Sequence, residues 1–363
     1  MPTNPKFHSE VLVQRVGELF CGPGGFATGA QLANRELTDV RFEHVWASDV
    51  DPDSCRTYGQ NIGELKKPSI YQCDVRNLEI DSLEAIDGFT FGFPCNDFSS
   101  VGKQLGILGE FGALYKFGID VLRAKQPMWF IAENVSGLRS PKNLHSFKNI
   151  LAEMNESGYN VTPHLFKFEE YGVPQSRHRI IVVGFRNDLG LKFEVPAPSH
   201  EMPRTAREAL HDPPIPLTAT NNELPNVSPH VRGRLRRIPP GKNAFNSGLP
   251  DKYRLNVKGA TMSQIYRRLD PAKPAYTVTG SGGGGTHVYH WSEDRPLTNR
   301  ERARLQTFPD EFEFFGSRGS VRRQIGMAVP VLASLRIHKA IAETLLGVDY
   351  KSVDANLIEH TLR

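Results

Sequence analysis

The glycine-rich segment behind the first predicted strand constrains the fold of this chain most. Residues 16–20 (VGELF) have the apolar character of a strand, and residues 22–27 (GPGGFA) fit the pattern G-x-G-x-x-[GA]. A helix-compatible stretch follows at 28–37. Glycines between a strand and a helix permit a tight turn and a close approach of the backbone to a ligand. The segment therefore predicts an α/β fold that binds a nucleoside-containing cofactor, with a plain β-turn-helix loop as the alternative.

Strand-like and helix-like segments continue to alternate through the first half of the chain. Further strands are predicted at 42–47, 69–73, 89–93, 128–132 and 179–185. This spacing predicts a doubly wound, mostly parallel sheet with helices on both faces. Residues 196–296 are rich in proline and glycine and have little helical periodicity, which predicts a smaller, loop-rich domain. We accordingly divide the chain into residues 1–188, residues 189–318, and a segment 319–363 that returns to the first domain.

The distribution of charge and the cysteine pattern favour some classes of function and argue against others. The 363 residues have a net charge of +4, but residues 201–300 hold 15 Lys and Arg against 8 Asp and Glu, a local charge of +7. A basic segment of this kind predicts a polyanionic partner, with a solvated surface as the alternative. The four cysteines form no metal-ligand pattern, which predicts no metal site and a reducing cytoplasm. The polar N-terminus and the absence of any apolar stretch near eighteen residues predict neither a signal peptide nor a membrane span.

Acidic residues follow two of the predicted strands. Asp49 lies 24 residues beyond Gly25, where a carboxylate can accept a hydrogen bond from a ribose hydroxyl. Asp74 follows the third strand, where it could accept a hydrogen bond from an amino group of a ligand or cap a helix. A nicotinamide dinucleotide would satisfy these features as well as S-adenosylmethionine would.

Three further features belong to the same edge of the sheet. Cys95 follows the fourth strand within Gly-Phe-Pro-Cys, and Glu133 follows the fifth. Arg177 and Arg179 stand at alternate positions leading into the sixth strand, so both are predicted to face one side. Alone, each has an ordinary alternative: a buried thiol, a capping acid, a solvated start of a strand. Together they predict a nucleophile, an acid and a cationic clamp.

The motifs, taken in order, resemble those of the DNA (cytosine-5)-methyltransferase family, of the prokaryotic restriction-modification type. The resemblance covers almost the whole chain: the cofactor loop at 20–25, the Pro-Cys pair at 94–95, Glu-Asn-Val at 133–135, Gln-x-Arg-x-Arg at 175–179, Leu-Gln-Thr-Phe-Pro at 305–309 and the last cofactor motif at 324–330. It implies a Rossmann-like methyltransferase fold that uses S-adenosyl-L-methionine, with residues 189–318 as the target-recognition domain.

The resemblance also implies roles for individual residues. The thiolate of Cys95 would add to C6 of a flipped-out cytosine, Glu133 would contact N3, and Arg177 with Arg179 would orient the base and Glu133. The implied cofactor contacts are Phe20, Cys21, Gly22, Pro23, Gly24, Gly25, Asp49, Val50, Asp74, Val75, Pro94, Leu114 and Ala328. Ser99 and Lys103, just past the nucleophile, lie on a glycine-containing segment that looks like a loop able to close on DNA. The basic segment adds Arg237, Arg267 and Arg268 as candidate DNA contacts, and the resemblance implies that Thr277 contacts the DNA backbone.

Two positions depart from the family pattern. Asn96 stands where the family usually has Gln, and Met327 where it has Asn. The expected function is methylation of duplex DNA by a cytoplasmic monomer, paired with a restriction endonuclease. The alternatives are an RNA cytosine-5 methyltransferase, an NAD-dependent oxidoreductase and an inactive DNA-binding relative.

Overall fold

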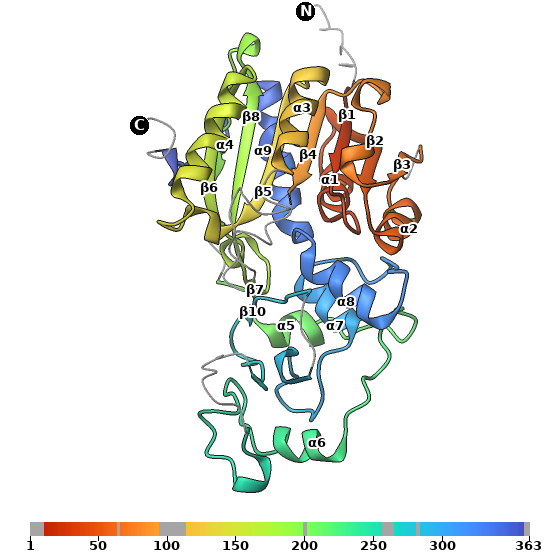
Figure 1. Cartoon of the computed structure of the whole chain (residues 1–363), viewed down its shortest axis with the longest axis vertical. Helices are drawn as coiled ribbons and strands as arrows, with labels where there is room; N and C mark the ends of the chain where they lie inside the picture. Colours follow the sequence, from red (N-terminus) through yellow and green to blue (C-terminus); the bar gives the residue numbers. More distant parts are fainter. Residues whose placement is uncertain are drawn as a thin grey trace, which may run out of the picture.

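A mostly parallel sheet is the centre of the computed structural model, which describes residues 11–63, 66–93, 114–198, 202–255, 265–280 and 284–358. Among these residues one sheet has seven strands (Figure 1). In spatial order they are β3 (Ser69–Gln72), β2 (Val40–Asp49), β1 (Leu12–Leu19), β4 (Gly88–Gly92), β5 (Trp129–Val135), β8 (His178–Arg186) and β6 (Tyr159–Lys167). β8 is antiparallel to both of its neighbours, and the other strands are parallel to one another. The predicted fold class is confirmed.

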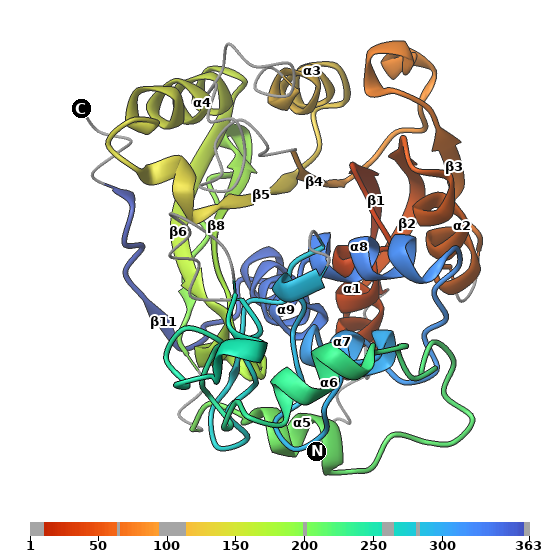
Figure 2. The same cartoon turned by 60° about the horizontal axis from the view of Figure 1, so that its bottom comes forward.

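Helices cover both faces of this sheet, as Figure 2 shows. On one face lie α3 (Tyr115–Lys125) and α4 (Leu144–Glu156), whose apolar side chains join those of β4 and β5 in one core cluster. On the other face α1 (Gly25–Glu36) packs against α9 (Val331–Leu346), and these two helices share the second cluster. α2 (Pro52–Asn61) lies beside β2 and β3. Two apolar layers therefore fix the height and orientation of the strand ends.

The sequence alone missed β6, α4 and the reversed direction of β8. β6 contains Pro163, His164 and polar residues at alternate positions, so its pattern is weaker than that of the buried central strands. Only residues 168–177 connect β6 to β8. A connection of ten residues without an α-helix suits an antiparallel return, whereas a parallel crossover needs a longer one, usually helical.

The last long helix also satisfies the criteria for a membrane span. The helical stretch Arg318–Leu346 is long and apolar enough by composition, but 78% of its most apolar window is buried inside the protein. Its apolar faces contact α1 and the second core cluster. We therefore describe it as core structure.

Most described residues of the predicted target-recognition domain (189–318), called the recognition region below, lie below the sheet in Figure 1 and form short elements joined by long loops. Two small apolar clusters organise it, one around Leu269 and Trp291, the other around Leu235 and Tyr289. Its helices and strands, with those of the connecting segments, are α5 (Ala206–His211), α6 (Pro229–Leu235), α7 (Asn299–Leu305), α8 (Arg318–Met327), β7 (Gln175–Ser176), β10 (Ala275–Tyr276), β9 (Val195–Pro196) and β11 (Ser352–Val353). β10 pairs with β7, and β11 with β9.

Two fully buried glutamines join the recognition region to the seven-stranded sheet and its helices, which we call the catalytic half after the prediction for residues 1–188 and 319–363. Gln175 donates from Nε2 to Leu305 O (3.0 Å) and to Gln306 Oε1 (2.9 Å), while its Oε1 accepts from Val278 N (2.8 Å). Gln306 donates in turn to Ile325 O at 2.6 Å. We call Gln175 and Gln306 the glutamine hub. Because buried amides are costly unless they are hydrogen-bonded, this arrangement fixes four distant segments relative to one another.

The end of α8 is packed closely against the loop that follows β10. A Cβ at Gly326 would lie 1.9 Å from Gly280 N, so no larger residue fits there without a backbone shift. α8 is also tied to α2, because Thr57 Oγ1 donates to Gln324 Oε1 at 2.8 Å. The segment that precedes α9 thus contacts both halves of the protein.

Candidate active site

The functional residues predicted from sequence collect at one edge of the sheet. β1 to β5 are parallel, so their carboxyl ends meet at the edge that faces the recognition region in Figure 1. β8 has the opposite direction, so its first residues lie at this same edge, with Arg179 opposite Val135. In open α/β sheets this edge is where ligands bind. The reversal of β8 is what brings the Arg motif to the strand ends.

The glycine loop after β1 has the geometry of a ligand cradle. Phe20, Gly22 and Gly24 have positive φ angles of 55°, 53° and 95°. A Cβ at Gly22 would meet no atom within 4 Å, whereas one at Gly25 would lie 2.4 Å from Val329 O. The first glycine therefore leaves open space beside the backbone, and the last permits α1 to pack on the segment before α9.

The acid behind β2 is bound to this loop. Asp49 accepts hydrogen bonds from Gly22 N (2.8 Å) and Asp51 N (2.9 Å). Its burial raises the pKa of the carboxyl, and the two backbone donors oppose that shift. Asp49 therefore fixes the shape of the cradle, whether or not it also contacts a ribose.

The remaining predicted cofactor residues differ in exposure. Asp74 caps the short 3-10 helix Val75–Asn77 by accepting from Arg76 N at 2.9 Å, which is the alternative its position suggested. Val75, Leu114, Ala328 and Cys21 are buried, while Val50 is 67% exposed. An exposed apolar side chain beside an acid and an open glycine backbone fits the face of an adenine ring. These residues are compatible with S-adenosyl-L-methionine; their individual contacts stay predictions.

Glu133 and Arg179 form an ion pair at the centre of the edge. Arg179 Nε lies 2.9 Å from Glu133 Oε1, and both side chains are 14% exposed. Glu133 Oε2 lies 3.4 Å from the position of a Cβ on Gly92, at the end of β4. A charged acid paired with a guanidinium and placed beside two strand ends can bind a polar ring edge.

Asn134 holds two strand ends together, a role that the sequence did not reveal. It is 3% exposed, donates from Nδ2 to Phe93 O at 3.2 Å and accepts from Val135 N at 2.8 Å. It thus holds the last described residue of the β4 segment against β5. The predicted residues Pro94, Cys95, Ser99 and Lys103 and the divergent Asn96 follow directly and lie outside the described residues.

Arg177 and Arg179 contact different parts of the protein. Arg177 is 2% exposed and donates from its two terminal nitrogens to Val278 O and Ala328 O, both at 3.1 Å. Only Arg179 has a described contact with Glu133. Arg177 therefore joins the recognition region to the α8–α9 connection, next to the glutamine hub, and acts in this structure as a positioning residue.

A buried polar cluster supports the glycine loop from below. Tyr58 Oη donates to Glu18 Oε2 at 3.0 Å, and His44 Nε2 lies 3.6 Å from the same oxygen. The Tyr58 ring is 3.0 Å from where a Cβ on Gly24 would stand. Burial raises the pKa of Glu18 to about 8 and lowers the pKa of His44 to about 3, so both side chains are neutral near pH 7.

Glu18→Gln is expected to stabilise the protein at alkaline pH. The unfolded chain ionises Glu18 above its ordinary pKa of 4.5, while the folded protein keeps it neutral to about 8, so the free energy of unfolding falls across this window. Removing this penalty should raise the stability by at least about 1.4 kcal/mol at pH 8.5, or about 2–4 °C in Tm. Thermal melts at pH 5 and 8.5 test this, because the gain should shrink at pH 5. An equal gain at both values would contradict it.

Three predicted DNA contacts lie in the recognition region with accessible side chains. Arg237 is exposed with its guanidinium 4.3 Å from the centre of the Tyr253 ring, and half-buried Arg267 lies 4.8 Å from that of Tyr276. Thr277 donates to Ser176 O at 2.7 Å. Their contacts with DNA stay predictions.

Arg268 does not fit its predicted contact with DNA. It is 4% exposed and donates to His290 O (2.9 Å), Leu235 O (2.7 Å) and Glu293 O (3.0 Å). It also forms an ion pair with Asp294 at 3.2 Å. With its donors used inside the domain, Arg268 stabilises the recognition region instead of facing a ligand. Charge alone does not distinguish a buried arginine from an exposed one.

The described residues contain no group of three or more His, Cys, Asp or Glu arranged to hold a metal ion. Cys21, Cys55 and Cys73 are free thiols.

Comparisons with known proteins agree with this site. A family described as C-5 cytosine-specific DNA methylase matches residues 14–343. The chain is 52% identical to the type II methyltransferase M.BbvI of Brevibacillus brevis, covering 94% of each chain, and 39% identical to M.NgoFVII of Neisseria gonorrhoeae, covering 94% of this chain and 89% of the relative. A putative prophage-encoded DNA modification methyltransferase from E. coli has the same fold, with TM-score 0.70 and 22% identity over 92% of this chain and 99% of that one.

These matches confirm the predicted family, activity and methyl donor, S-adenosyl-L-methionine. They leave the roles of single residues as predictions. The chain belongs to the C-5 cytosine-specific DNA methylase family and is a type II DNA (cytosine-5-)-methyltransferase of a restriction-modification system.

Proposed function

We propose that the chain methylates one cytosine of a specific duplex sequence through a covalent bond between Cys95 and C6 of a flipped-out base. The observation that carries this proposal is the Glu133–Arg179 ion pair beside the end of β4. That strand leads directly to the Pro-Cys pair, so the acid and the nucleophile are supplied by adjacent strand ends. A cytosine inside a stacked duplex cannot reach such a site, which is why base flipping is part of the proposal.

Each of the proposed catalytic residues has a separate role in the reaction. The Cys95 thiolate adds to C6, and Glu133 shares a proton with N3, which relieves the negative charge that builds on the ring. Arg179 holds Glu133 in position. Bound S-adenosyl-L-methionine would supply an electrophilic methyl group to C5 and would be left as S-adenosylhomocysteine. Transfer of the C5 proton to a solvent base and departure of the Cys95 sulfur as a thiolate then restore the aromatic ring.

The proposed partners follow from the family of the chain and from its type II relatives. Binding of DNA is common to the family. A monomer paired with a cognate restriction endonuclease, working in the cytoplasm, is the organisation that we propose for this chain.

Bisulfite sequencing of DNA from cells that express the chain tests the proposal. Cytosines at one position of one sequence motif should resist conversion, and cells that express Cys95→Ser provide the matched control. Transfer of tritiated methyl groups to duplex DNA and to tRNA, measured in parallel, separates the DNA enzyme from an RNA methyltransferase. Methylation of tRNA without protected cytosines in DNA would overturn the proposal.

A further inference from the structure

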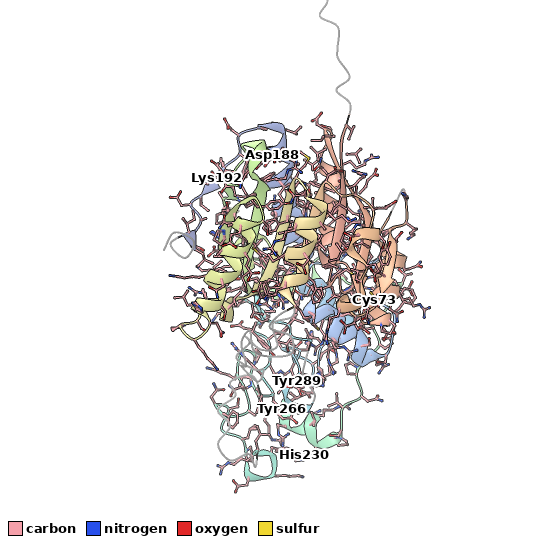
Figure 3. All side chains as sticks on the ribbon, turned by 45° about the horizontal axis from the view of Figure 1, so that its top comes forward. Cys73, Asp188, Lys192, His230, Tyr266 and Tyr289 are labelled. Carbon is pink, nitrogen blue, oxygen red and sulfur yellow. The ribbon has the colours of Figure 1, made fainter. Side chains whose placement is uncertain are left out.

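A pocket of about 390 Å³ lies in the recognition region, away from the Glu133–Arg179 pair. It is bounded by the start of α6, by the first turn of α7 and by α8. Tyr266 and Tyr289 line one wall, with ring centres 5.4 Å apart and ring planes inclined by 27°. Figure 3 labels both tyrosines, between the catalytic half and His230 on α6. Its polar lining includes Arg302, Arg318 and Arg322.

Arg302 is a buried cation without an acidic partner in the described part of the chain. It is 3% exposed, and its hydrogen bond is to His287 Nδ1, at the long distance of 3.4 Å. Burial, together with the nearby Arg322, lowers the pKa of Arg302 to about 10. Its neighbour in sequence, Glu301, forms a bidentate pair with Arg295 instead, at 2.7 and 2.8 Å. A buried charge in this condition is costly unless a ligand completes its hydrogen bonds.

Other buried arginines of the same region provide an internal comparison. Arg268 is paired with Asp294 and with three backbone carbonyls. Arg300 donates to Thr220 O, Pro309 O and Phe312 O. Both therefore have their acceptors inside the protein. Arg302 differs from these two arginines of the same region because it has a single long hydrogen bond, and it is the one of the three that lines the pocket.

Arg322 and Arg318 add two more guanidinium groups to the same pocket. They are four residues apart on α8, so they share one face of the helix. Arg322 Nε is buried and has no hydrogen-bond partner among the described residues, while Arg318 is exposed. Arg302 and Arg322 also lower the pKa of His287, after burial, to about 4, which keeps that ring neutral near pH 7. The acidic side chain that lines the pocket, Glu223, is exposed.

We infer that this pocket binds a phosphate group, with Arg302, Arg318 and Arg322 as its ligands. Guanidinium groups bind phosphate oxygens through paired N–H donors, and phosphate supplies the acceptors that Arg302 and Arg322 lack. The apolar wall of tyrosines reduces the local dielectric and strengthens the interaction. The phosphate comes either from the backbone of the DNA substrate or from a free phosphate anion, and the two sources predict different results.

Two sets of variants test the inference. The double variant Arg318→Gln with Arg322→Gln removes two of the ligands. Arg318 is exposed and Arg322 is half-buried, so this variant should still fold. Arg302→Met removes the buried ligand. Arg323→Gln is the control, because it removes one positive charge from the next position of α8 but lies outside the pocket. Circular dichroism identifies any variant that fails to fold.

Inorganic phosphate is the first probe, and duplex DNA is the second. Phosphate titrated against chloride at equal ionic strength should raise the Tm of the wild type and of Arg323→Gln saturably, but not that of the pocket variants. If DNA is the source, the slope of log affinity against log salt should also fall by about one per lost phosphate contact in the pocket variants alone. A phosphate effect without a change in slope identifies a free anion.

The inference is overturned if folded pocket variants match Arg323→Gln in both measurements. The phosphate measurement needs no methyl transfer, so its outcome is independent of the proposed covalent mechanism. An inactive protein would fail the bisulfite test and could still show the pocket effect.

Discussion

Cys95→Ser is expected to reduce methyl transfer by on the order of 10⁴-fold or more while duplex binding remains measurable. A serine hydroxyl is almost entirely protonated near pH 7, so it cannot add to C6 as a thiolate does. Phe93, two residues before Cys95, accepts a hydrogen bond from Asn134, so the end of the β4 segment does not depend on the sulfur. The measurement is incorporation of tritiated methyl groups into duplex DNA, with affinity measured separately by filter binding or fluorescence anisotropy.

A covalent trap tests the same mechanism through the appearance of a product instead of a loss of activity. DNA with 5-fluorocytosine at the target should form a stable adduct with the wild type, because fluorine on C5 cannot leave as a proton does. The adduct should survive denaturing electrophoresis, map to the peptide that contains Cys95, and be absent from Cys95→Ser. Near-normal turnover by the variant, or an active wild type that is never trapped, would end the covalent mechanism.

Glu133→Gln is expected to lower kcat by about 10²–10³-fold with little change in the KM for DNA. Glutamine preserves the size of the side chain and can still accept from Arg179, but it neither shares a proton with N3 nor balances the guanidinium charge. The effect should therefore fall on the transition state and not on binding of the ground state. Steady-state kinetics under saturating methyl donor measure both constants.

A surface acid of the same domain gives the matched control for Glu133. Glu36 is paired with Lys339 at 2.6 Å on an exposed face, so Glu36→Gln should leave kcat unchanged and alter stability by no more than about 1 kcal/mol. Thermal melts of both variants separate an effect on chemistry from an effect on folding. A Glu133→Gln enzyme within threefold of wild type would exclude the assigned role.

Local signals in the sequence predicted the sheet edge well. Gly22 and Gly25 are required by a backbone that approaches a ligand or another helix, and such requirements are visible as residue types at fixed spacing. Glu133 and Arg179 were predicted from their places beside strands, and the structure brings them to 2.9 Å. In each case the chemistry and the position along one element sufficed.

What the sequence did not predict depends on contacts between distant segments. The direction of β8 follows from its pairing with β6, a strand whose own pattern is weak. The burial of Arg268 and Arg302 depends on how the loops of the recognition region pack, and neither charge nor spacing reports it. The domain boundaries stay a prediction for the same reason, since α7 packs with α8 across the proposed division.

The glutamine hub has a consequence for how such enzymes acquire new targets. Apart from their mutual bond, the side chains of Gln175 and Gln306 are satisfied by main-chain atoms of Val278, Leu305, Ile325 and Ala328. Every amino acid except proline supplies the same backbone donor and acceptor, so the hydrogen bonds of the glutamine hub do not depend on the side chains of the segments that it holds. Mutations that change which bases are read can therefore accumulate in the recognition region without a matching change in the catalytic half. Specificity can drift while the joint between the two halves stays constant.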